Sequence, residues 1–243
     1  EYIKNLIKIF LQRGNFVRGP INLNNRVGGL HKAWGHIFSN HLYGDYVEFG
    51  VYKGESFLNS IQQYKVFMSW LESQKSSSEH WRRDVANSSP LNEKILFHGL
   101  DTFTGMPDNN EDNFTFARGT FLSDFDNVYS LINKEYDNFK LYKGSFQETK
   151  ENLHTNLENR KVSIVNLDCD IYSSTIQALE IIENYLIIGS VIMFDDFNAF
   201  NADNKKGQRR AFGEFLSKSK FTVDEFSTYF YSGKSFVVTG IKN

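Results

Sequence analysis

The sequence lacks three features that would assign it to a broad class. Cys169 is the only cysteine among 243 residues, which excludes a disulfide framework and a cysteine-based zinc cluster. No apolar run reaches the roughly 18 residues of a membrane span, so we expect no membrane partner and a cytoplasmic location. With a net charge of −2, the chain also lacks the basic excess of nucleic-acid-binding proteins, and we expect no nucleic-acid partner.

The spacing of apolar residues predicts an α/β fold. Short β-branched and aromatic runs fall near residues 45–49, 95–100, 139–143, 162–167, 190–195, 220–226 and 234–241. Helical patterns separate most of these runs, which is typical of a doubly wound, mostly parallel seven-stranded sheet, and the last two runs fit an antiparallel hairpin. We expect a single domain over 1–243, with a helical cover over 1–44 and a Rossmann-like core over 45–243.

Three segments outside the predicted sheet have patterns of their own. Residues 1–12 carry apolar side chains at helical spacing, and a second amphipathic stretch runs to Ile37. We expect a cover that closes over the site or, for residues 1–12, a helix that packs on the core. The polar segment 73–90 is expected to be a mobile insertion, and the acidic, Asn-rich segment 107–119 a lid.

Two of the predicted strands end in acidic residues. The run 164–167 is followed by Asp168 and Asp170, and the run 191–194 by Asp195 and Asp196. Because a parallel crossover brings both carboxyl ends to one edge of a sheet, we expect Asp168, Asp195 and Asp196 to converge. Carboxylates that repel one another suit a hard divalent cation such as Mg²⁺, and the alternative is that they cap helices or turns. Cys169, between two acids, is not expected to be a nucleophile.

A glycine turn follows the first predicted strand. Gly50 and Gly54 stand between Glu48 and a helical pattern, and glycine allows a ligand to approach the backbone closely. The dinucleotide fingerprint G-x-G-x-x-G is absent, and an acid stands where a pyrophosphate would need donors. An acid suits the cationic aminoacyl and sulfonium groups of S-adenosylmethionine instead. An ordinary strand-to-helix turn is the alternative.

Two further strand ends fit the same cofactor. Asp101 ends the second run, where an acid commonly accepts hydrogen bonds from ribose hydroxyls. The third run passes through Gly144 and Ser145 into a helix, where the backbone and Phe146 would border an adenine ring. An ordinary turn accounts for this third segment equally well.

Together these segments resemble a known family. The pattern comprises Glu48 to Gly54, Asp101 to Pro107, Gly144 to Phe146, the D-x-D-x-Y-x-S-T block from Asp168, Asp195 to Phe197, and residues 207–211. Over about residues 45–215 the chain is similar to the macrocin O-methyltransferase family. Those enzymes are S-adenosylmethionine- and Mg²⁺-dependent methyltransferases of sugar hydroxyls with the class I, Rossmann-like fold.

The resemblance implies a role for each candidate residue. Asp168, Asp195 and Asp196 would bind Mg²⁺ or another divalent cation, and Asp101 would hold the ribose of S-adenosyl-L-methionine. Asp168 and Asp170 are expected to be catalytic, and the spacing leaves Asp170 open as ligand, base or helix cap. The expected cofactor-binding residues are Glu48, Phe49, Gly50, Gly54, Ser56, Asp101, Thr102, Phe103, Gly144, Ser145, Phe146 and Asp168.

The expected reaction is direct transfer of the sulfonium methyl group to a metal-chelated hydroxyl of a small-molecule sugar or glycoside. A bound metal acidifies such a hydroxyl, and the base would be Asp170 or one of His31, His36 and His41. Two alternatives stay open: a metal-independent small-molecule methyltransferase, and a non-catalytic S-adenosylmethionine-binding domain of a larger assembly. Because the sequence starts at Glu1 and not at Met, we expect part of a longer chain, and a homo-oligomer also stays open.

Overall fold

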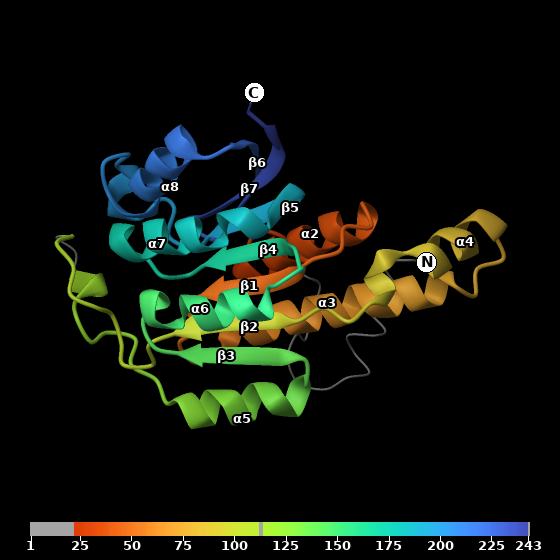
Figure 1. The fold of residues 1–243 in the computed structure, drawn as a ribbon, viewed down its shortest axis with the longest axis horizontal. Helices are drawn as coiled ribbons and strands as arrows, with labels where there is room; N and C mark the ends of the chain where they lie inside the picture. Colours follow the sequence, from red (N-terminus) through yellow and green to blue (C-terminus); the bar gives the residue numbers. More distant parts are fainter. Residues whose placement is uncertain (1–21, 112–113, 243) are drawn as a thin grey trace.

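The computed structural model describes residues 22–111 and 114–242 and contains a seven-stranded sheet with helices on both faces (Figure 1). The strands are β1 (Asp45–Phe49), β2 (Phe97–Asp101), β3 (Phe139–Lys143), β4 (Val162–Leu167), β5 (Leu186–Phe194), β6 (Phe221–Tyr229) and β7 (Gly233–Ile241). Their order is β3-β2-β1-β4-β5-β7-β6. Strands β1 to β5 are parallel, β7 is antiparallel to β5, and β6 is antiparallel to β7. The predicted doubly wound, mostly parallel sheet with a closing hairpin is confirmed.

Two hydrophobic cores separate the sheet from the helices on its faces. The helices are α2 (Arg26–Ser39), α3 (Glu55–Gln74), α4 (His80–Ser88), α5 (Phe125–Glu135), α6 (Phe146–Asn156), α7 (Tyr172–Ile182) and α8 (Gly207–Lys218). Helices α2, α3 and α5 contribute to one core, and α6, α7 and α8 to the other. Strand β4 serves both, because Ile164 faces the first core and Val165 the second. Within the described residues, no helix combines the length and the apolar character that a membrane crossing requires.

Helix α2 is the described part of the predicted N-terminal cover; residues 1–12 lie outside the described residues. Trp34 is fully buried, and its indole Nε1 donates a hydrogen bond to Ser60 Oγ of α3 at 3.0 Å. The side chain of Asn25 caps the helix by accepting from the backbone N–H of Gly28 at 2.8 Å. Helix α2 therefore packs as a core helix, and its first turn is fixed by its own cap.

The segment 73–90 is more regular than its composition indicates. Helix α3 extends to Gln74, and α4 covers His80–Ser88. Arg83 Nη1 donates to the carbonyl oxygens of Ser77 and Ser78 at 2.7 and 3.0 Å, which stabilises the turn before α4. Because Ala86 is the one buried residue of α4, this helix packs little apolar surface on the core, and its sequence lacks the wide apolar stripe that marks a core helix. The insertion is thus largely helical, and its mobility stays a prediction.

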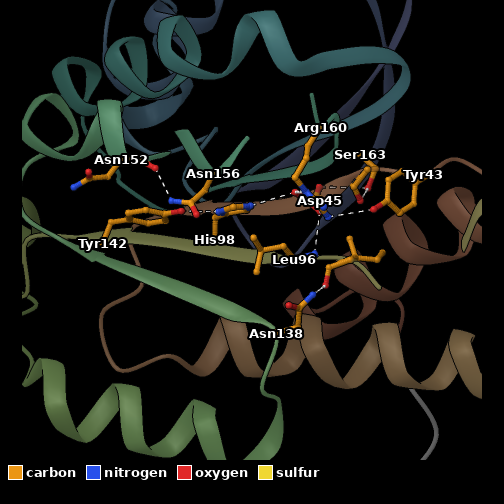
Figure 2. A network of polar contacts seen from close by, with 12 residues as sticks. Tyr43, Asp45, Leu96, His98, Asn138, Tyr142, Asn152, Asn156, Arg160 and Ser163 are labelled. Carbon is orange, nitrogen blue, oxygen red and sulfur yellow. Dashed lines mark hydrogen bonds and ion pairs between the residues drawn. The ribbon is translucent and has the colours of Figure 1, made fainter. Parts of the chain in front are cut away.

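A buried polar network lies near the edge of the sheet at which β1 and β2 begin (Figure 2). The carboxylate of Asp45, fully buried, accepts from Arg160 Nε and Nη2 at 2.5 and 2.6 Å and from the backbone N–H of Leu96 at 2.9 Å. His98 Nε2 lies 3.2 Å from Asp45 Oδ2, and His98 Nδ1 lies 2.9 Å from the Tyr142 hydroxyl. Burial raises the pKa of Asp45, but its donors, Arg160 first, outweigh burial and hold the pKa below its ordinary value.

We expect Asp45→Ala to lower the free energy of unfolding by about 3–5 kcal/mol, because Arg160 and His98 lose their buried acceptor. Urea unfolding followed by circular dichroism measures this change. The matched control is Asp137→Ala, since Asp137 pairs with Lys94 at the surface, and its loss should leave the unfolding midpoint nearly unchanged. Equal effects of the two substitutions would contradict a stabilising role for the network.

Candidate functional site

The carboxyl ends of β2, β1, β4 and β5 lie side by side at the opposite edge of the sheet (Figure 1). Strands β2 and β3 extend the sheet on one side of β1, and β4 and β5 extend it on the other. Ligands of open α/β sheets bind at such a reversal of strand order. Hydrogen bonds continue past the strand ends, from Asp168 N to Phe49 O at 2.9 Å and from Asp195 N to Leu167 O at 3.2 Å. The backbone that carries the two aspartates is therefore fixed by the sheet itself.

Three aspartates converge at this edge, as the sequence predicts. Asp168, Asp195 and Asp196 each offer one carboxylate oxygen, and these oxygens lie within 4.8 Å of one another. An ion with metal–oxygen distances of about 2.1–2.6 Å can bridge such a span. Burial raises the pKa of Asp168 and of Asp195, and the charges of the neighbouring carboxylates raise both further. The three side chains thus form a group whose mutual repulsion a cation would relieve.

Asp170 lies beside these three side chains without belonging to the group. It is buried, and its φ of 60° is in the left-handed region. Burial raises the pKa of Asp170 well above its ordinary value, and the nearby carboxylates of Asp196, Asp168 and Asp195 raise it further. No side chain of the N-cap residue bonds to the start of α7, and Glu111 Oε2 accepts from the N–H of Tyr172 at 3.1 Å instead. Asp170 is therefore not the cap of α7.

Two residues of the site were missed by reasoning from the sequence. Arg26, the first residue of α2, forms an ion pair with Asp195 Oδ2. Tyr229, the last residue of β6, is 2% exposed, and its hydroxyl has no hydrogen-bond partner among the described residues. Burial raises the pKa of Tyr229, and the charges of Asp195 and Asp168 raise it further. Neither residue stands in a local motif, because each meets the acids only through tertiary packing.

Two further side chains hold the backbone of the acidic strand ends. Gln208 of α8 donates from Nε2 to Leu167 O at 2.9 Å and accepts at Oε1 from Asp196 N at 3.0 Å. Ser232 Oγ donates to Asp195 O at 2.8 Å. These bonds connect β4, β5 and α8, so the positions of the three carboxylates depend on side chains from the C-terminal third of the chain.

The glycine turn after β1 contacts both neighbouring strand ends. Gly50 has a φ of +93°, and a Cβ at this position would lie 1.9 Å from the carbonyl oxygen of Asp168, so no other residue fits. Asp101 reaches the same turn from the end of β2. Its carboxylate accepts at 2.6–2.8 Å from the backbone N–H groups of Val51, Tyr52 and Phe103. A carboxylate has about four acceptor positions, so one remains for a ligand hydroxyl.

Glu48 is fully buried beside this turn. Its Oε1 accepts from Ser56 Oγ at 2.7 Å, and its Oε2 accepts from the Tyr46 hydroxyl and from Asn166 Nδ2, the latter at 3.2 Å. Burial raises the pKa of Glu48 to about 8 in spite of these donors. A cationic ligand next to Glu48 would favour its charged form, which fits the predicted partner of an aminoacyl group.

The other predicted cofactor-binding residues have partners within the protein. Phe49 is buried and packs edge-on against Phe146, with ring centres 5.0 Å apart. Ser145 caps α6 in a capping box, and Thr102 Oγ1 donates to Gly105 O at 3.1 Å. The remaining three are Phe103, which packs on Phe125, and the turn glycines Gly54 and Gly144, both with positive φ. Cofactor binding by these residues stays a prediction.

The three histidines considered as bases form hydrogen bonds elsewhere. The pairs are His31 Nδ1 with Gln63 Oε1, His36 Nε2 with Gly189 O, and His41 Nδ1 with Ser89 Oγ, at 2.9, 3.1 and 2.9 Å. Their partners belong to α3, to the middle of β5 and to the residue before the short 3₁₀ helix Pro90–Asn92. Of the four base candidates, Asp170 is the one whose pKa is raised by the charges of the three aspartates.

A family comparison matches most of this site. The profile described as Macrocin-O-methyltransferase (TylF) covers residues 83–231. The matched range includes Asp101 and the four aspartates at the ends of β4 and β5, and it begins after the glycine turn. No curated protein sequence matches the chain at a significant level.

Solved structures show the same fold. The O-methyltransferase NovP is similar with a TM-score of 0.63 and 16% identity over 98% of each chain. CalS11, a calicheamicin methyltransferase, is similar with a TM-score of 0.63 and 17% identity over 97% of this chain and 90% of its own. A putative caffeoyl-CoA O-methyltransferase from Staphylococcus aureus has a TM-score of 0.52 and 11% identity over 99% and 93%. At these identities the likeness shows the fold alone.

We expect Glu48 to lower the stability of the ligand-free protein as the pH rises from about 5 to 8. Its folded pKa of about 8 lies above the ordinary value of about 4.3, so the folded state binds more protons over this range and stability falls with pH. The slope contributed by one such group is at most about 1.4 kcal/mol per pH unit. Urea unfolding in chelator at several pH values should show a shallower fall for Glu48→Gln. Parallel stability curves for both proteins would contradict this role of Glu48.

Proposed function

This chain belongs to the Macrocin-O-methyltransferase (TylF) family and is an O-methyltransferase, and on that premise we propose that it methylates a sugar hydroxyl, using S-adenosylmethionine and a divalent metal ion. The observation that carries the proposal is the convergence of Asp168, Asp195 and Asp196 within 4.8 Å beside the glycine turn of β1. CalS11 is described as a TDP-rhamnose 3'-O-methyltransferase, which supports a sugar or glycoside as the class of acceptor.

The residues present fit a divalent cation. Asp168, Asp195 and Asp196 supply the hard oxygen ligands that such ions prefer, and Gln208 and Ser232 hold the strand ends in place before the ion arrives. The Arg26 guanidinium at Asp195 shows that the site already accepts a positive group. When bound, a divalent cation lowers the pKa of a coordinated hydroxyl and fixes its direction.

We assign the proton of the acceptor hydroxyl to a carboxylate oxygen of Asp170. Asp170 is buried beside Asp168, Asp195 and Asp196, whose charges act on its carboxyl, and it is not one of the three convergent ligands. A cation at the three aspartates would favour the charged form of Asp170. This carboxylate would then accept the hydroxyl proton as a general base.

The glycine turn and its two acids fit S-adenosylmethionine. This cofactor supplies a methyl group on a positively charged sulfur atom. Gly50 leaves the backbone of the turn open to close approach, Glu48 lies buried beside it, and Asp101 keeps one acceptor position for a ribose hydroxyl. Because Gly50 also packs against the backbone of Asp168, the proposed cofactor and metal sites are adjacent, as methyl transfer in line requires.

S-adenosylhomocysteine should stabilise the protein, with a rise in Tm of about 5–10 °C at a ligand concentration about 100 times Kd. Asp101→Ala should abolish most of this rise, because it removes the proposed ribose acceptor. Differential scanning fluorimetry measures both, and Asp137→Ala, at the surface, serves as the control that keeps the full rise. A rise with a nicotinamide dinucleotide and none with S-adenosylhomocysteine would refute the proposed cofactor.

Asp196→Ala should abolish Mg²⁺ binding in calorimetry, reduce methyl transfer by orders of magnitude, and keep the stabilisation by S-adenosylhomocysteine, because it removes a metal ligand and leaves the glycine turn intact. Transfer is measured with radiolabelled S-adenosylmethionine against a panel of glycosides. Unchanged turnover of the wild-type enzyme after exhaustive chelation would favour a metal-independent methyltransferase and end the metal-assisted proposal.

A further inference from the structure

We propose that Arg26 is an internal counter-cation, which occupies the place of the divalent ion and competes with it for Asp195. The inference rests on the proposed function, because it takes the three aspartates as ligands of the ion. It goes beyond that function by assigning a role to Arg26, the first residue of α2. Arg26 would determine how much divalent ion is needed to fill the site.

The guanidinium contacts an oxygen that the ion would use. Arg26 Nη2 pairs with Asp195 Oδ2, and the side chain of Asp195 is only 5% exposed. The charges of Asp168 and Asp196 also act on Arg26, so all three carboxylates attract its guanidinium. A guanidinium and a divalent cation on one buried carboxylate repel each other. Occupation by one therefore disfavours occupation by the other.

The Arg26 side chain can leave the site without unfolding the helix. It is 47% exposed, and its guanidinium also lies 5.1 Å from the ring centre of Phe230. The surrounding backbone is fixed by other groups, since Asn25 caps α2 through Gly28 N at 2.8 Å, and Asn24 O accepts from Phe230 N at 2.5 Å. A swing of the side chain into solvent thus leaves α2 and the β6–β7 hairpin in place.

The site has hydrogen-bonding capacity that Arg26 does not satisfy. The Tyr229 hydroxyl is buried and has no partner within the described part of the chain, although Asp195, Asp168 and Arg26 all act on it electrostatically. A buried hydroxyl without a partner is costly. A hydrated ion brings both positive charge and water molecules, which can satisfy this hydroxyl. The arrangement with Arg26 therefore leaves the Tyr229 hydroxyl without a hydrogen-bond partner among the described residues.

The charges give the direction of the exchange. Arg26 offers one positive charge to three carboxylates, whereas a divalent ion offers two. The ion therefore replaces Arg26 once its concentration is high enough, and the affinity measured for the ion is reduced by the fraction of molecules in which Arg26 holds Asp195. Removing the charge of Arg26 removes this competition.

The test is direct ion binding to the full chain after chelation, by calorimetry with Mg²⁺ and by electron paramagnetic resonance with Mn²⁺. Arg26→Met, which keeps the length of the side chain without its charge, should bind both ions about tenfold more tightly. Arg26→Lys keeps a positive charge and should stay within about threefold of wild type. Arg210→Met removes the same charge from α8, where Arg210 pairs with Glu214, and should leave the affinity unchanged.

Thermal stability gives a second readout. In chelator, Arg26→Met should have a lower Tm than wild type, because three carboxylates lose their counter-charge, and saturating Mg²⁺ should close this gap. Equal or weaker ion binding by Arg26→Met would overturn the inference and leave the proposed metal site intact. If neither the wild type nor any variant binds either ion, the metal-assisted function itself fails, and the inference fails with it.

Discussion

Repulsion among carboxylates on neighbouring strand ends is the interaction on which the site depends. Asp168 and Asp195 are held by backbone hydrogen bonds that continue the ladder of the parallel sheet, so they cannot move apart without breaking it. The side chain of Asp196 lies within the same 4.8 Å group. Burial weakens the screening of such charges. Burial and this repulsion raise the pKa of Asp168 and of Asp195, and the guanidinium of Arg26 supplies a positive charge at Asp195.

The opposite side of the sheet, where β1 begins, shows that burial alone does not raise the pKa of a carboxylate. Asp45, the first residue of the central strand β1, is also fully buried, yet its carboxylate accepts hydrogen bonds from Arg160, from His98 and from the backbone of Leu96. These donors hold its pKa below the ordinary value, while those of Asp168 and Asp195 are raised. The carboxylate of Asp45 has hydrogen-bond donors for both of its oxygens. Asp168, Asp195 and Asp196 together have more acceptor oxygens than the described residues have donors for them. Such an excess is typical of a site that binds a cation.

The sheet was predictable because each strand is a short apolar run between polar turns. Strands β1, β3 and β4 begin and end at the predicted residues. Strand β5 starts at Leu186, earlier than predicted. The prediction missed its first residues because Gly189, with a φ of +93°, interrupts the apolar pattern that marks a strand. Helix α4 was not predictable, since Ala86 is its one buried residue. The spacing of apolar residues predicts an element because it marks the side chains that the element buries. This signal is weak for an element, such as α4, that buries few side chains.

The convergence of Asp168, Asp195 and Asp196 was predictable for a different reason. A parallel crossover fixes where two strand ends meet, so acids placed directly after the strands must come together. Arg26 and Tyr229 reach the same point from a helix start and from an antiparallel edge strand. No rule of local sequence connects those positions to β4 and β5. Their contacts are set by how α2 packs on the sheet, which only the assembled fold defines.

Glycine at position 50 is required for a structural reason that the sequence pattern does not reveal. The close approach of a ligand would favour glycine at this position. Independently of any ligand, the Cβ of another residue would lie 1.9 Å from the carbonyl oxygen of Asp168 and collide with it. The turn of β1 and the acidic end of β4 therefore share one contact. Several predicted side chains of the turn region, such as Phe49 and Ser145, serve packing or capping. The backbone of the turn, together with Glu48 and Asp101, is the part that we propose to bind the cofactor, and it is held against the strand end that carries the proposed metal ligands.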